Sequence, residues 1–135
     1  MAERPDQGQE YVVGFEYQIL DNARNPDARN GADHLTVARY DIAAPARDAT
    51  RPVGEFNRSR LVVKGNHAEH WLNGVKVVDT NLNASHAAER IAHRWGLGTP
   101  VYEEMTKQPK KDCQISLQNH GDEAWFRNIR IRRLE

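Results

Sequence analysis

Residues 65–78, GNHAEHWLNGVKVV, gather side chains that could bind a metal or a sugar. His67, Glu69, His70 and Trp71 stand directly before an Asn-Gly pair. Imidazole and carboxylate groups can hold a divalent metal or transfer protons, and an indole ring can stack on a sugar. What these groups can do together depends on the element that carries them.

The stretch is predicted to form a β-hairpin. The residues on either side of the Asn-Gly pair are rich in β-branched and aromatic types, and Asn-Gly is the strongest short-range signal for a two-residue turn. Successive side chains of a strand alternate between faces, so His67 and His70 are not expected to share one ion. The helical zinc motif, with histidines at i and i+4, is also absent. Two interpretations stay open: a half-exposed polar sheet surface, or a concave face on which tryptophan, histidine and glutamate bind a sugar.

The composition limits the class of protein. The chain has 135 residues, enough for one domain, and its nineteen acidic and nineteen basic residues balance, so no net field favours nucleic acid or a membrane surface. Cys113 is the only cysteine, which excludes an intramolecular disulfide and a zinc-thiolate centre. No signal-peptide core or membrane-length apolar run is present. The sequence as written predicts a cytoplasmic chain, or a periplasmic or secreted one if an upstream segment is missing.

Most of the chain is predicted to consist of short strands. Residues 1–10 are expected to be disordered, and residues 11–135 to form one domain. Helix-forming residues with Ser85 as a cap and Gly96 as a stop predict a short helix, followed by a long loop over 97–112. The predicted strands cover 11–21, 34–45, the hairpin 59–81, 113–121 and 124–134. This pattern favours an all-β antiparallel sandwich or jelly roll with one short helix in a connection.

Four motifs resemble one known family. GFEYQILDNARNPDARN, RYDIAAP, RPVGEFNRSRLVVKGNHAEHWLNGVKVV and ISLQNHGDEAWFRNIRIRRL are similar, in order and spacing, to the 3-keto-disaccharide hydrolase family, also called domain of unknown function 1080. The likeness runs from about Gly14 to Leu134. It implies a jelly-roll sandwich of the concanavalin-like lectin and glucanase type, acting on glycosides whose sugar carries a ketone at carbon 3. The family's N-terminal strands have no counterpart here, so we expect an incomplete sandwich, completed by a homo-oligomer or a partner chain.

The resemblance also implies a chemistry. A ketone at carbon 3 acidifies the hydrogen on carbon 2, so the glycosidic bond can break by elimination followed by hydration. This route needs a base, a donor for the enolate oxygen and an acid for the leaving group. His120 or Glu16 is the expected base, and a divalent metal held by both is an alternative enolate stabiliser. The expected substrate-binding residues are Gln18, His67, Glu69, Trp71 and Gln118.

These side chains would converge if their three strands were neighbours. Asp21, His34 and Tyr40 lie in the matching motifs too, but the sequence does not decide which way they face. Three functions therefore stay open: a 3-keto-glycoside-cleaving enzyme, a non-catalytic carbohydrate-binding sandwich, and an inactive truncated relative.

Overall fold

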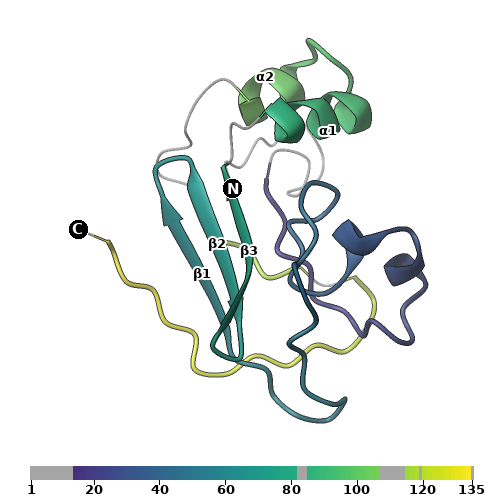
Figure 1. Ribbon diagram of the computed structural model, residues 1–135, viewed down its shortest axis with the longest axis vertical. Coiled ribbons are helices and arrows are strands. Elements are labelled where there is room, and N and C mark those ends of the chain that lie inside the picture. Colours follow the sequence, from purple (N-terminus) through teal and green to yellow (C-terminus); the bar gives the residue numbers. More distant parts are fainter. Residues whose placement is uncertain (1–13, 82–84, 107–114, 119, 135) are drawn as a thin grey trace.

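The computed structural model describes residues 14–81, 85–106, 115–118 and 120–134. It contains a three-stranded antiparallel sheet in the order β1-β2-β3, with two short α-helices at one end of the sheet (Figure 1). The elements are η3 (Pro26–Arg29), η4 (Ala32–His34), β1 (Ser59–Lys64), β2 (His67–Leu72), β3 (Val75–Asn81), α1 (Ser85–Trp95) and α2 (Pro100–Thr106). Within the described ranges, no helix is long and apolar enough to cross a membrane.

The predicted hairpin is confirmed. β2 pairs with β3 across Leu72 and Val75, and the turn between them has positive φ at Asn73 (51°) and Gly74 (86°). This is the left-handed backbone that Asn and Gly tolerate best. The expected alternation is present as well, because Ala68, His70 and Leu72 are buried while His67 is exposed.

The buried side of the sheet is covered by residues 14–50. This inner face carries Leu61 and Val63 of β1, which stand opposite His70 and Ala68 of β2. His70 Nδ1 donates to the carbonyl of Val37 over 2.7 Å, and burial lowers the pKa of His70, so the ring is held neutral. Half of the inner face is therefore packed: His70 is 4% exposed, whereas Leu61 is 50% exposed.

The strands predicted over 11–21 and 34–45 are not formed in the described part of these ranges. Only isolated bridges are present, between Tyr17 and Arg39 and between Arg39 and Ala43. Val37 (φ 72°) and Asp41 (φ 59°) have left-handed backbone, which reverses the chain and prevents a continuous ladder. Residues 1–13, including the segment expected to be disordered, lie outside the described residues.

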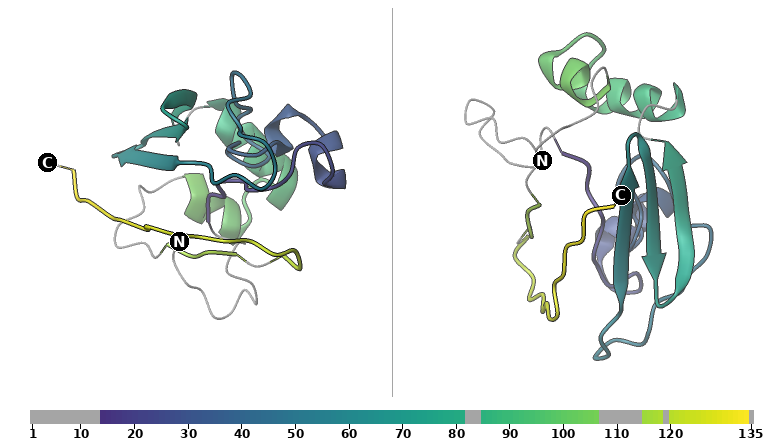
Figure 2. Two further views of the ribbon diagram at one scale, coloured as in Figure 1. Left: turned by 90° about the horizontal axis from the view of Figure 1, so that it is seen from below. Right: turned by 90° about the vertical axis from the view of Figure 1, so that its left-hand side faces the viewer.

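The C-terminal strands are not formed within the described residues either. Residues 115–118 and 120–134 carry no strand ladder, and both views of Figure 2 show this segment as a layer set apart from the sheet. Its large apolar side chains are exposed, for example Trp125 at 71% and Ile131 at 78%. A strand forms where a neighbouring strand pairs with its backbone groups, and the three described strands pair only with one another.

The predicted helix is confirmed as α1, but the predicted loop over 97–112 contains a second helix, α2. Thr99 caps α2, because its Oγ1 accepts from Tyr102 N at 3.2 Å, and Pro100 occupies the first position. The expectation of one helix is therefore wrong, and the Thr-Pro pair was the missed signal. The two helices pack around Ile42 through Ala87, Ile91, Val101 and Met105.

A candidate active site around Glu16 and His34

Asp27 is the centre of a group of hydrogen-bonded polar side chains. Its Oδ1 accepts from Asn30 Nδ2 (2.8 Å), His34 Nδ1 (3.0 Å) and Tyr40 Oη (3.3 Å), and its Oδ2 accepts from Gln18 Nε2 (3.3 Å). Burial alone would raise the pKa of Asp27, but the hydrogen bonds from His34, Asn30 and Tyr40 outweigh it and lower that pKa. We call these five residues the Asp27 cluster.

Local structure explains the position of Asp27. Asn25 caps η3, with its Oδ1 accepting from Asp27 N at 2.9 Å, and Pro26 starts the turn. This fixes the backbone of Asp27 and directs its carboxylate toward η4, where His34 stands. Thus the Asn-Pro-Asp segment, which reads as a loop in the sequence, positions the acceptor on which the cluster depends.

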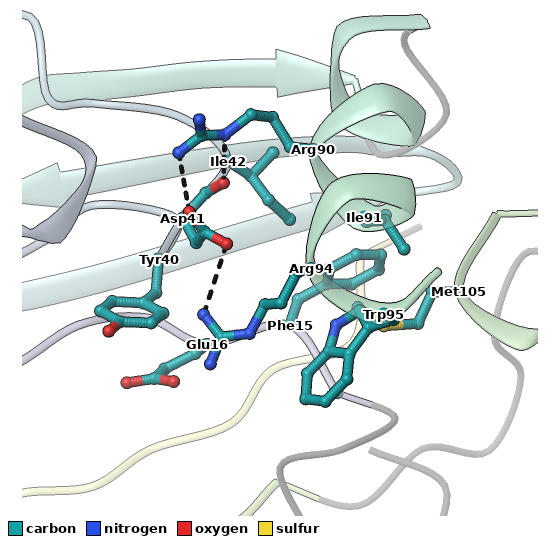
Figure 3. Close-up of a pocket in the computed structure, with 11 residues that line it drawn as sticks. Phe15, Glu16, Tyr40, Asp41, Ile42, Arg90, Ile91, Arg94, Trp95 and Met105 are labelled. Atoms are coloured by element: carbon teal, nitrogen blue, oxygen red, sulfur yellow. Dashed lines mark hydrogen bonds and ion pairs between the residues drawn. The ribbon is translucent and has the colours of Figure 1, made fainter. Parts of the chain in front are cut away.

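α1 supplies two arginines beside this cluster. Arg90 Nη2 bonds Asp41 Oδ1 at 2.7 Å and also pairs with Asp33, and Arg94 Nη1 lies 3.4 Å from Asp41 Oδ2. Figure 3 shows Arg94 reaching from the helix toward Asp41 and Glu16. The helix therefore brings positive charge to a site that is otherwise rich in carboxylates.

Glu16 lies half-buried beside the arginines. Burial raises the pKa of Glu16 above its ordinary value, and the positive charge of Arg94 offsets part of this effect. The cavity that Glu16 lines with Tyr40 and Arg94 has a volume of about 30 Å³. That is room for a water molecule and not for a sugar, so a sugar could only lie over its mouth. A raised pKa is what a general base near neutral pH requires.

Two of the predicted site residues meet here, and a third acts nearby. Glu16 and Gln18 belong to this site, and His120 is close enough for its charge to lower the pKa of Glu16. Gln118 is exposed on the C-terminal segment. Convergence of all the candidates depended on their three strands being neighbours, and that condition is not met in the described residues. The remaining three, His67, Glu69 and Trp71, project from the opposite face of the sheet.

That outer face carries His67, Glu69 and Trp71 beside Lys76 and Asp79 of β3. The register sets Glu69 opposite Asp79, and Lys76 bridges the two carboxylates, 3.4 Å from Glu69 Oε1. Trp71 Nε1 donates to Glu69 Oε2 at 2.8 Å, and His67 Nε2 lies 2.6 Å from Asp79 Oδ1. We call these five residues the outer-face group.

Metal-ligating atoms converge on this outer face. Among the residues that the structure describes, one set of three, His67, Glu69 and Asp79, has ligand atoms within 4.8 Å of one another. Glu16 and His120, the alternative metal ligands expected from the sequence, are not in such a set. The Lys76 ammonium already supplies a cation between the two carboxylates.

A wider hollow of about 590 Å³ runs along β3, next to Asp33 and His86. It contains none of the residues predicted to form the site. The sequence reasoning also missed Asp27, Asp41, Arg90 and Arg94. The sequence signal of the two arginines was weak, since a pair of arginines four residues apart on a predicted helix is usually a solvated face.

Comparisons with known proteins show the family of this chain. Residues 1–132 match the model of the 3-keto-alpha-glucoside-1,2-lyase-like domain. A 3-keto-disaccharide hydrolase from Bacteroides thetaiotaomicron is 29% identical, over 93% of this chain and 46% of the relative. The crystal structure of a glycosyl hydrolase candidate from Parabacteroides distasonis has a TM-score of 0.61 and 25% identity, over 75% of this chain and 48% of that one. The chain thus spans about half the length of these relatives. It belongs to the 3-keto-alpha-glucoside-1,2-lyase-like family.

Proposed function

We propose that this chain cleaves glycosides that carry a ketone at carbon 3, by elimination followed by addition of water. The observation that carries the proposal is Glu16, a half-buried carboxylate with a raised pKa, next to a cationic side chain and a cluster of polar donors. The family membership and the name of the Bacteroides relative support the substrate class.

Glu16 is the proposed base. It takes the proton from carbon 2, and the charge moves to the oxygen at carbon 3 as an enolate. Arg94 brings positive charge to this part of the site and favours that charge. Gln18 and Gln118 are proposed to bind the sugar, and His120 to act as a second proton-transfer residue because its charge acts on Glu16.

We also propose that further strands complete a jelly-roll sandwich over the inner face. Leu61 and Val63 remain 50% and 47% exposed there, although the neighbouring side chains of β2 are buried. Apolar side chains on an edge strand such as β1 favour association with another β-segment. The same reasoning applies to the exposed apolar residues of the C-terminal segment.

Non-catalytic carbohydrate binding is the second candidate function. The outer-face group favours it, because an indole ring there is surrounded by carboxylate, imidazole and ammonium groups that can bond sugar hydroxyls. His67, Glu69 and Trp71 would be its ligands. Trp71→Ala should then abolish sugar binding measured by calorimetry.

The test compares release of a chromogenic group from a 3-keto-glucoside and from the same glucoside unoxidised. We expect release from the keto substrate alone, and Glu16→Gln should lower it at least about 100-fold, because general-base catalysis contributes that much or more. His93→Gln is the matched control, since His93 is exposed on α1. Equal release from both glucosides, or full activity of Glu16→Gln, would contradict the proposal.

A further inference from the structure

The orientation of His34 is fixed by its neighbours. Its Nδ1 lies 3.0 Å from Asp27 Oδ1, and its ring stands edge-on to Tyr40 with the centroids 4.5 Å apart. The side chain is only 14% exposed. An ionised carboxylate can only accept a hydrogen bond, so Nδ1 carries the hydrogen, and Nε2 of the neutral ring carries the lone pair.

Nε2 of His34 lies on the side of the ring that faces Asp41. It lies 3.9 Å from Asp41 Oδ1, beyond hydrogen-bond distance. Asp41 is itself held in place by Arg90 and Arg94. When both ring nitrogens carry hydrogen, the positive charge therefore meets a carboxylate on each side, Asp27 at Nδ1 and Asp41 near Nε2.

Asp27 does not need the imidazole to satisfy its hydrogen-bonding capacity. Asn30, Tyr40 and Gln18 also donate to Asp27, so the carboxylate would keep three partners without the imidazole. What the Asp27 contact adds is control of the imidazole, because a carboxylate bonded to Nδ1 selects the tautomer and orientation in which Nε2 reacts.

We infer that His34 is a further proton-transfer residue of this site and that Asp27 positions it. The inference rests on the proposed elimination, which needs an acid as well as a base. Glu16 takes the proton from carbon 2 to give the enolate. The bond between carbon 1 and the glycosidic oxygen then breaks, the ketone re-forms beside a new double bond between carbons 1 and 2, and His34 Nε2–H gives its proton to the leaving oxygen. Water afterwards adds its oxygen to carbon 1 and a proton to carbon 2.

The two proton transfers can be measured separately. Exchange of the carbon-2 hydrogen for deuterium in D2O, followed by proton NMR, reports the base, and release of the alcohol reports the acid. Methyl and nitrophenyl 3-keto-glucosides are compared. Nitrophenolate is a stable anion that leaves without being protonated, whereas methoxide must receive a proton from an acid as it leaves. Wild type, His34→Gln, Asp27→Asn, Glu16→Gln and the control His93→Gln are run together, each shown to be folded by circular dichroism.

We expect His34→Gln to keep deuterium exchange, to lose methanol release about 100-fold, and to recover most release with nitrophenol. Asp27→Asn should give the same split with a smaller loss, and Glu16→Gln should lose both steps. The inference about His34 is overturned if His34→Gln releases methanol at the wild-type rate, or if it loses exchange and both kinds of release equally. If the wild type neither exchanges nor releases, the proposed function itself fails and the role of His34 falls with it.

Discussion

At the scale of single residues, ionised Glu16 is expected to cost stability. Burial raises its pKa in the folded protein, so the protonated form is favoured on folding and stability is lost as the pH rises through that pKa. Glutamine resembles the protonated acid. Glu16→Gln should therefore raise Tm at pH 7, and the gain should vanish as the pH falls below the unfolded value of about 4.3. Thermal unfolding at several pH values tests this, and a gain that persisted at pH 3 would point to a different cause.

Arg39 is a buried arginine whose guanidinium has no hydrogen-bond partner among the described residues. It is 1% exposed, and no described residue accepts a hydrogen bond from its Nε, Nη1 or Nη2, although its guanidinium stacks 4.0 Å from the ring centroid of Phe15. Burial lowers the pKa of Arg39 to about 10. Removing an unpaired buried charge while keeping the volume should help folding.

Arg39→Met should therefore stabilise the protein, by about 1–3 kcal/mol, in urea unfolding. Arg39→Ala is the matched variant, since it removes the charge but leaves a cavity, and its stability should lie clearly below that of Arg39→Met. A strong loss of stability in Arg39→Met would show that the guanidinium has a partner that stabilises the fold.

At the scale of elements, the β2–β3 turn should depend on both of its residues. Gly74→Ala should cost about 1–2 kcal/mol, because an L side chain is strained at positive φ. Asn73→Ala should cost more, since Asn73 also donates to the carbonyl of Ala49 and accepts from Arg58 N. Urea unfolding measures the loss of unfolding free energy in each variant. A larger loss in Gly74→Ala than in Asn73→Ala would show that backbone strain, and not these hydrogen bonds, dominates the turn.

How much the sequence predicted differs between elements for a physical reason. The hairpin and α1 were predictable, because an Asn-Gly turn, period-two alternation and a helix stop are local signals. The extended pattern of residues 34–45 predicts a strand. The left-handed backbone at Val37 and Asp41, which prevents that strand, is set by tertiary contacts that no local sequence pattern contains.

The candidate site residues were also predictable only where local sequence signals suffice. Glu16 and Gln18 are candidates because they lie in a motif that resembles the family and alternation sets them on one face, and both lie in the candidate site. His67 and Trp71 lie on the other face of the sheet, and the sequence does not say on which side of the sheet residues 14–50 pack. Arg94 reaches Asp41 across 53 positions of the chain, and no spacing rule predicts such a contact.

At the scale of the whole molecule, the two ends of the inner face differ. Toward β3 it is covered, with Val77 and Val78 at 2% and 4% exposure, and toward β1 it is open at Leu61 and Val63. The chain spans 46% of its Bacteroides relative. An open apolar face on β1, an edge strand of the sheet within the described residues, favours association.

We therefore expect the wild-type chain to associate as its concentration rises, and Val63→Lys to stay monomeric. Because Val63 is already 47% exposed, the substitution should change the Tm of the monomer little. Val53→Lys is the control: Val53 is 73% exposed outside the sheet, and its replacement adds the same charge away from the inner face. Sedimentation equilibrium gives the mass of each variant over a concentration series. Equal association of Val63→Lys and wild type would place the contact on another surface, whereas a wild type that is monomeric throughout would mean that the open face does not pair with a second copy.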